Sequence, residues 1–259
     1  MSLFAPSTTL HVLNLCRHHL PLLQVLRLEE ALLRSDSRNW LVLYPGPAAA
    51  PTIVVGVSGK LDSLVHVEAA RAARATILRR FTGGGTVVAD GGTLFVSLCL
   101  ARGAAAGQPL FPREVMQWSQ GLYSPVFAAL LRPGQPAFSL QENDYCVGDL
   151  KLGGNAQAVS RERWVHHTSF LWTINPSHMA LLKVPEKRPA YRRDRPHGDF
   201  LTCLRDVCHP HAKQEVFYDA LLHTLRQQAP NLTLVPATLE EAMLVLPKNE
   251  RVSNEEIVF

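Results

Sequence analysis

Hydrophobic residues recur at helical spacing in several separate stretches of the chain. Between residues 22 and 33, leucine and valine repeat so that they would lie on one face of a helix, because side chains three and four positions apart share a face. The motif Thr238-Leu239-Glu240-Glu241 is typical of a capping box at the start of a helix. The predicted helices cover residues 20–34, 65–74, 113–131 and 213–228, and a last one begins at residue 238.

Short apolar runs between these segments predict strands. Glycines interrupt the runs at residues 83–85 and 91–92, so neighbouring strands are joined by tight connections. The strands come in groups with helices between the groups, which favours an α+β fold over a doubly wound parallel sheet. No linker divides the chain, and we expect residues 1–259 to form a single domain. The predicted strands cover residues 40–44, 52–57, 76–80, 86–89, 94–100, 137–152, 156–159 and 164–173.

The composition indicates a globular protein. Of 259 residues, 47% are hydrophobic and 19% are charged, so a core can form without disulfides or a structural metal. The longest apolar stretches, such as residues 94–101, are far shorter than the roughly 20 residues of a membrane-spanning helix. The net charge of +4 is too small to indicate a nucleic-acid-binding surface. We therefore expect neither a membrane nor a nucleic acid as a partner.

The cysteines and the N-terminal residues bear on metal binding and location. An odd number of scattered cysteines is typical of free thiols in a reducing compartment. A cluster of cysteine and histidine at residues 203–211 lacks the paired spacing of zinc sites, so we expect no metal site. The N-terminal residues lack the apolar segment of a secretory signal. These features predict a cytoplasmic protein, with a mitochondrial location as the alternative. The cysteines are Cys16, Cys99, Cys146, Cys203 and Cys208.

Positive charge is concentrated between residues 183 and 195. This segment contains six basic residues and only two acidic ones, Glu186 and Asp194. Its excess of positive charge equals the net charge of the whole chain. Such a run is either a solvated loop or a loop that closes over an anionic ligand. The six are Lys183, Lys187, Arg188, Arg192, Arg193 and Arg195.

The most informative segment runs from Arg79 to Asp90 with the sequence RRFTGGGTVVAD. Three glycines between two strands let backbone amides approach a ligand closely, because no side chain intervenes. The two arginines before them supply guanidinium groups that suit a phosphate or a carboxylate. Neither Gly-Lys-Ser/Thr nor a helix follows, so this is not a Walker A loop or a dinucleotide fingerprint. It is either an anion-binding loop or a hairpin turn with a basic flank.

A second informative segment, KLGGNA, begins at Lys151. A lysine on a strand is costly to bury unless an anion compensates its charge, although such a lysine can also simply protect a sheet edge. Asn143 and Asp144 precede this segment, and a strand with His166 and His167 follows it. Because adjacent residues of a strand face opposite sides, one of the two histidines at most can line a site with the lysine.

In this order and separation, the segments resemble the lipoate-protein ligase A family of the biotin/lipoate ligase superfamily. The resemblance covers about residues 20–206 and includes the Leu28-Glu29-Glu30 helix, both glycine motifs and the two histidines. It implies a mixed, largely antiparallel sheet flanked by helices. It also implies that lipoate and ATP, with Mg²⁺, form lipoyl-adenylate, whose acyl group passes to a lysine of a lipoyl domain. The implied acceptors are 2-oxoacid dehydrogenase E2 subunits and the glycine cleavage H protein.

The resemblance further implies a role for each motif residue. Lys151 is then the catalytic residue, because its charge offsets the repulsion between the attacking carboxylate and the α-phosphate and later stabilises an oxyanion. Arg80 and the backbone of residues 85–88 would hold the nucleotide phosphates, and the basic run would be a mobile lid. Residues 143 and 144 would lie at the adenine and metal-side contacts. The implied nucleotide- or lipoyl-adenylate-binding residues are Arg79, Arg80, Gly83, Gly84, Gly85, Thr86, Val87, Val88, Asn143, Asp144, Gly153, Gly154, Asn155, Ala156 and His167.

Two departures from the family pattern leave three activities open. Ala89 stands where family members often carry histidine, and the chain ends at Phe259 without the C-terminal accessory domain of longer ligases. The chain would then close its site alone or with a separate accessory polypeptide. It is either an ATP-dependent ligase, an ATP-independent lipoyl or octanoyl transferase, or a non-catalytic binding protein. A transferase needs a cysteine nucleophile, and Cys146 is not where we expect one. The residues do not distinguish lipoate from octanoate or biotin.

Overall fold

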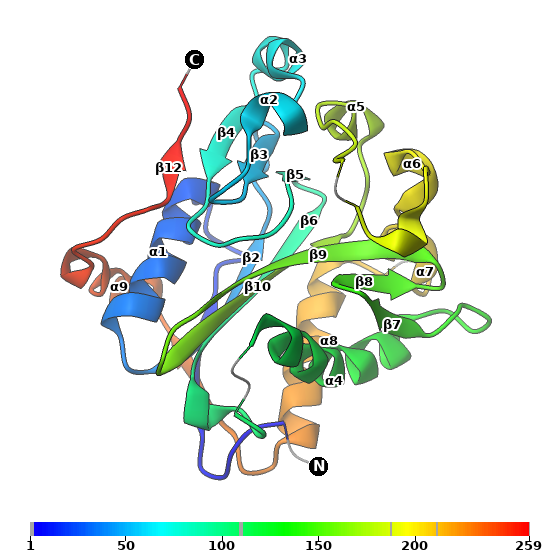
Figure 1. Cartoon of the computed structure of the whole chain (residues 1–259). Coiled ribbons are helices and arrows are strands. Elements are labelled where there is room, and N and C mark those ends of the chain that lie inside the picture. The colour runs from blue at the N-terminus through cyan, green and yellow to red at the C-terminus, as the bar shows by residue number, and fades with distance from the viewer. Residues whose placement is uncertain (1–2, 109–110, 187, 211, 259) are drawn as a thin grey trace.

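The computed structural model of the chain describes residues 3–108, 111–186, 188–210 and 212–258 (Figure 1). Within these residues, the strands form one sheet of eight strands and one of four. In the larger sheet β1 runs parallel to both its neighbours, and every pair from β2 to β7 is antiparallel. The sheet is therefore mixed and largely antiparallel, as the resemblance implied. Its order is β11 (Thr233–Ala237), β1 (Thr9–Asn14), β2 (Asn39–Pro45), β6 (Thr93–Ala101), β10 (Arg163–Leu171), β9 (Leu150–Val159), β8 (Asp144–Val147) and β7 (Phe138–Gln141).

The smaller sheet carries the ends of the RRFTGGGTVVAD segment. Strand β4 is followed by the glycines and then by β5, and β3 lies between β4 and β5. One face of this sheet packs toward the larger sheet, while its other face is covered by α2 (Leu61–Leu64) and α3 (Val67–Ala72). The order is β12 (Glu255–Glu256), β4 (Thr76–Arg79), β3 (Thr52–Val55) and β5 (Val87–Ala89).

Helices cover both faces of the larger sheet because its central strands are apolar on both sides. Along β6, Leu94, Val96 and Leu98 face α4 (Pro112–Leu130) and α8 (Gln214–Gln228), whereas Phe95 and Cys99 face α1 (Leu22–Ser35). Figure 1 shows α1 and α9 on one side of the sheet and α4 and α8 on the other. Burial on both faces makes β6 the centre of the larger sheet, and Ser97 is a buried polar residue between Phe95 and Cys99 on its α1 side.

Short helices connect the remaining strands. Three of them, α5, α6 and α7, follow β10 and lead the chain past the end of β9. Their bounds and those of the other short elements are α5 (Pro176–Met179), α6 (His197–Phe200), α7 (Leu204–Val207), α9 (Leu239–Met243), η1 (Arg102–Ala104), η2 (Ala190–Arg192) and η3 (Leu246–Lys248). No helix in the described ranges is long and apolar enough to cross a membrane.

The structure confirms most predicted elements and corrects some. The Thr238 capping box is present, although its helix has only five residues. Residues 150–159 form one continuous strand through Gly153 and Gly154, not two strands broken by these glycines. The reason is that β10 pairs with this segment along its length. Strands β1, β11 and β12 were not predicted, because they are edge or near-edge strands whose partners lie far away in the sequence.

Candidate active site

The triple glycine forms a loop that lies directly on strand β9. Gly84 has a φ of +104°, and a Cβ on this residue would lie 3.1 Å from the carbonyl oxygen of Asn155 and 3.7 Å from the Cβ of Ala156. This position therefore requires glycine for both its conformation and its closeness to β9. By contrast, no atom of the described residues lies within 4 Å of a Cβ built on Gly83 or Gly85. The backbone there is open to a ligand.

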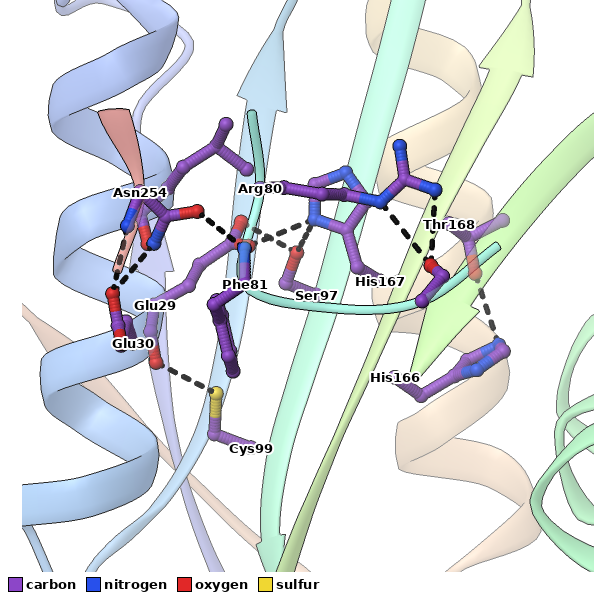
Figure 2. Close-up of polar contacts among 12 residues, drawn as sticks. Glu29, Glu30, Arg80, Phe81, Ser97, Cys99, His166, His167, Thr168 and Asn254 are labelled. Carbon is purple, nitrogen blue, oxygen red and sulfur yellow. Dashed lines mark hydrogen bonds and ion pairs between the residues drawn. The ribbon is translucent and has the colours of Figure 1, made fainter. Parts of the chain in front are cut away.

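The two arginines before the glycines both donate to backbone carbonyl oxygens, Arg80 mainly within the glycine loop and Arg79 in the segment that follows β3. The guanidinium of Arg80 donates to the carbonyl oxygens of Val54, Gly83 and Gly85, at 3.3, 3.0 and 2.6 Å. Figure 2 shows this guanidinium directed at the backbone of the loop. Arg79 donates in the same way to carbonyl oxygens of residues 56, 57 and 59. The donors of Arg80 are thus occupied by backbone carbonyl oxygens, and its expected contact with phosphates stays a prediction.

The charge of Arg80 is nevertheless important for the site. The side chain is 4% exposed, and burial lowers the pKa of Arg80 to about 10. Carbonyl oxygens orient a cation without neutralising it, and no carboxylate in the described part of the chain forms an ion pair with this guanidinium. Next to it, the buried hydroxyl of Thr86 has no hydrogen-bond partner among the described residues. The loop therefore presents positive potential and a free hydroxyl.

Lys151 lies on β9 with its ammonium group beside the glycine loop. A Cβ on Gly154 would lie 3.8 Å from Lys151 Nζ, 3.8 Å from the Val87 side chain and 3.6 Å from Ser169 Oγ. The lysine, the strand after the glycines and β10 thus meet above one glycine. At 3.6–3.8 Å these are ordinary van der Waals contacts, so Gly154 marks the meeting point of these elements.

The Asn143-Asp144 pair supports the lysine from the next strand. Lys151 Nζ forms an ion pair with Asp144 Oδ1 at 2.7 Å, and both side chains are largely buried. The carbonyl oxygen of Asn143 accepts a hydrogen bond from Asn155 Nδ2 at 2.6 Å. The pair therefore lies beside Lys151, as its place in the motif order suggested. Its expected contacts with adenine and metal stay predictions.

His167 and His166 face opposite sides of the sheet, as predicted. His167 Nδ1 contacts Glu29 Oε2 at 2.8 Å and Ser97 Oγ at 2.9 Å on the α1 side (Figure 2). His166 Nε2 contacts Tyr145 Oη at 2.7 Å on the side of α4. Ala156 on β9 is the direct neighbour of His167 on β10, so His167 is the histidine that shares a face with the site.

The adjacent glutamate Glu30 anchors the C-terminal segment against the glycine loop. Asn254 Nδ2 donates to Glu30 Oε2 at 2.8 Å, and Asn254 Oδ1 accepts from the backbone amide of Phe81 at 3.1 Å (Figure 2). Strand β12 then pairs with β4 immediately before the loop. Sequence reasoning missed Glu29, Glu30 and Asn254 as site residues. Two glutamates on the apolar face of an amphipathic helix were the available signal.

The basic run from 183 to 195, whose residue 187 lies outside the described residues, begins against α2 at Lys183, and its residues 190–195 pack beside β8 and the start of β9. The backbone amide of Ala190 donates to Glu142 Oε1 at 2.7 Å, and Tyr191 Oη donates to Asp144 Oδ2 at 2.9 Å. Arg195 Nη1 contacts Asp149 Oδ2 at 3.1 Å. Acidic residues thus dock this basic segment beside the lysine. Its opening and closing as a lid stay a prediction.

Cys146 lies on β8 directly opposite Lys151 on β9. Its thiol donates to Tyr191 Oη at 3.3 Å, and burial raises the pKa of Cys146 to about 11. The thiolate that a nucleophile needs is therefore scarce at neutral pH. Burial also lowers the pKa of His166 to about 3, and this histidine is on the other side of the sheet, so it is no base for the thiol.

In a comparison with known proteins, residues 21–226 match the family described as lipoyl protein ligase A/B catalytic domain. The chain belongs to this family. Its fold is the biotin/lipoate ligase fold, seen in two solved structures that share 17–18% of residues with it. One is a bi-partite lipoate protein ligase from Thermoplasma acidophilum, described with its E2 lipoyl domain (TM-score 0.73, 18% identity, 94% of this chain and 92% of that chain). The other is a lipoate-protein ligase A bound with ATP (TM-score 0.69, 17% identity, 93% of each chain).

A curated relative of this lipoyl ligase domain comes from Plasmodium falciparum and bears the name inactive lipoate–protein ligase 2. It is 29% identical over 189 residues, which covers 61% of this chain and 49% of the relative. The chain spans about half the length of the curated relatives it matches. Among the described residues, no group of three or more histidine, cysteine, aspartate or glutamate side chains could hold a metal ion, and His211 of the cysteine–histidine cluster lies outside them.

Proposed function

We propose that this chain is an ATP-dependent lipoate–protein ligase that activates lipoate, or octanoate, as an acyl-adenylate and transfers the acyl group to a lysine of a lipoyl domain. The observation that carries the proposal is that two parts of the site lie on successive residues of β9. The Lys151 ammonium group and the Val87 side chain lie beside Gly154, and the glycine loop with the guanidinium of Arg80 lies on Asn155 and Ala156. Such a site suits two anions that must meet, a carboxylate and a nucleotide phosphate.

In the first half-reaction, an oxygen of the lipoate carboxylate attacks the α-phosphorus of ATP, and the bond from this phosphorus to pyrophosphate breaks. Lys151 would offset the charge repulsion at the moment the new P–O bond forms, because its ammonium group is held in place before the substrates arrive. The backbone around Gly83 and Gly85 and the hydroxyl of Thr86 would bind phosphate oxygens.

The second half-reaction is attack of the acceptor lysine on the carbonyl carbon of the mixed anhydride. An amide bond forms, AMP leaves and the amine releases a proton. Lys151 would stabilise the negative charge on the carbonyl oxygen during this attack. The proposed acceptors are 2-oxoacid dehydrogenase E2 subunits and the glycine cleavage H protein, supported by the E2 lipoyl domain named with the Thermoplasma ligase.

Mg²⁺ is the ion that we expect with ATP. It is usually bound through substrate phosphates and one or two carboxylates and does not need a protein cage of its own. Asp144 is the carboxylate beside Lys151 that fits this role. Bound there, the ion would supply further charge neutralisation on the departing pyrophosphate.

Two alternatives give different results in one assay. The purified chain is given lipoate, ATP and Mg²⁺, and pyrophosphate release is measured with and without a lipoyl domain; pre-made lipoyl-adenylate tests transfer separately. Adenylation and transfer together support the ligase. A thioester on a cysteine without ATP would support the transferase, which the raised pKa of Cys146 disfavours. Tight nucleotide binding with neither half-reaction would support a non-catalytic protein, the alternative that the name of the Plasmodium relative favours.

The same assay tests the need for a second polypeptide. The Thermoplasma neighbour is described as bi-partite, which supports a two-part arrangement for this chain as well. Adenylate hydrolyses in water, so the site must close around it. We expect the isolated chain to transfer the lipoyl group from pre-made lipoyl-adenylate, but to form the adenylate from lipoate and ATP only slowly. Rapid adenylation by the isolated chain would contradict the two-part arrangement.

A further inference from the structure

Arg192 is a buried arginine whose hydrogen bonds are incomplete. It is 4% exposed, its guanidinium lies 4.6 Å from the centre of the Phe200 ring, and its Nε donates to the carbonyl oxygen of Arg195 at 3.1 Å. Its Nη2 is buried and has no hydrogen-bond partner among the described residues. A buried guanidinium nitrogen without an acceptor is unfavourable, and buried donors are almost always paired. The unpaired nitrogen therefore indicates an acceptor that comes from outside the chain.

The position of Arg192 limits what this acceptor can be. The preceding residue, Tyr191, donates to one oxygen of Asp144, and the other oxygen of that carboxylate pairs with Lys151. On the other side, the backbone amide of Thr202 donates to the carbonyl oxygen of Lys151 at 2.9 Å. Arg192 is thus on a segment fixed to the catalytic lysine at both ends.

Electrostatics at this place favour an anion. Burial, together with the positive charges of Arg192 and Lys151, lowers the pKa of His197 to about 4. Both cations are therefore near His197, and the one carboxylate among them, Asp144, is already engaged by Lys151. An anion bound between the two cations would compensate the charge of Arg192, which forms no ion pair among the described residues. A guanidinium group suits the oxygens of a phosphoryl group because it offers donors in a fixed fork.

We propose that Arg192 is the residue that binds the phosphoryl group of the acyl-adenylate opposite Lys151. This inference rests on the proposed function and adds to it a residue that the glycine motif did not indicate. It assigns different tasks to two buried arginines. Arg80 donates to three carbonyl oxygens and shapes the loop, whereas Arg192 keeps a donor for the ligand.

The test compares binding of two probes by calorimetry. One is lipoyl-sulfamoyl-adenosine, a stable analogue whose sulfamate stands for the phosphoryl group, and the other is lipoate alone. Arg192→Met keeps much of the packing against Phe200 but removes the donor. The matched control is Arg193→Gln, which removes the same charge from an exposed side chain one position away. We expect Arg192→Met to weaken binding of the analogue by roughly 10- to 100-fold, as for a lost charged hydrogen bond. Its affinity for lipoate should be unchanged.

The other outcomes overturn the inference in distinguishable ways. If Arg192→Met and Arg193→Gln lose the same affinity for the analogue, the effect is one of long-range charge. If Arg192→Met loses the same affinity for the analogue and for lipoate, the role of Arg192 is purely structural. If Arg192→Met does not fold, Arg192→Lys keeps the charge and loses the fork, and unchanged affinity for the analogue would refute the proposal. If the natural protein itself binds neither the analogue nor ATP, the proposed function fails and this inference with it. If the natural protein and Arg192→Met bind the analogue equally well, the role of Arg192 is refuted and the proposed function stands.

Discussion

Replacement of Lys151 by methionine separates the catalytic part of this residue from its structural part. Methionine keeps an unbranched apolar stem in place of the lysine stem and removes the charge. The lysine side chain is 26% exposed and that of Asp144 is 12% exposed, so this ion pair is largely buried. The variant therefore leaves the mostly buried carboxylate of Asp144 with the hydroxyl of Tyr191 as its hydrogen-bond donor among the described residues.

Two magnitudes follow from this geometry. Leaving a largely buried charged acceptor without its partner costs about 1–3 kcal/mol of folding free energy, between the values for exposed and fully buried pairs. Loss of a charge directed at the transition state costs on the order of 10²–10³ in rate. Lys151→Met should therefore be both less stable and nearly inactive. Adding Asp144→Asn removes the unpaired charge and should restore most of the stability.

The assay measures urea unfolding and lipoyl transfer from pre-made adenylate for the natural protein, Lys151→Met and the double variant. We expect the double variant to regain stability without regaining activity. Recovery of activity together with stability would mean that Lys151 acts only by holding the fold. Near-natural activity of Lys151→Met would refute its assignment as the catalytic residue.

Three further variants test other parts of the site. Gly84→Val should abolish ATP binding in calorimetry, because its Cβ would lie 3.1 Å from the Asn155 carbonyl oxygen at a φ of +104°; normal binding would show that the glycines are only a turn. Cys146→Ser should keep most ligase activity, since burial holds the pKa of this thiol at about 11; loss of turnover together with a trapped thioester would favour the transferase. Burial lowers the pKa of His166 from 6.5 to about 3. As the pH falls, His166 is therefore protonated in the unfolded chain before it is protonated in the folded chain. The free energy of unfolding is unaffected by this group above pH 6.5 and decreases between pH 6.5 and pH 3, by up to roughly 1.4 kcal/mol per pH unit. His166→Gln should flatten this decline in urea unfolding measured across that range, and an unchanged slope would contradict the reasoning.

The local sequence pattern was sufficient to predict the long helices and to recognise the motifs and their order. Helices α1, α4 and α8 were predicted within two residues of their ends, because apolar spacing and packing agree there. The structure places the glycine loop and Lys151 on the same strand, with Gly84 against Asn155 and Lys151 Nζ near Gly154, and their joint action stays a prediction. Such features are readable in sequence because the residues that define them are close neighbours in the chain.

Other parts of the site depend on contacts between distant segments. Glu29 is a charged residue on a buried helix face, and its partners Ser97 and His167 are on strands far along the chain. The direction of Arg80, toward carbonyl oxygens and not toward solvent, follows from the path of its own loop. The free donor of Arg192 is visible only after its neighbours are placed.

The pairing of Asn254 with Phe81 also orders the events of biosynthesis. These two residues are 173 positions apart, so the amide before the glycines receives its acceptor only after residue 254 has left the ribosome. The entropic cost of closing so long a loop rises slowly with its length, and the contact can form readily once both partners exist. Strands β2, β6, β10 and β9 pair among residues made earlier. We infer that a nascent chain assembles the centre of its large sheet first, and that the glycine loop becomes rigid only at the end of translation.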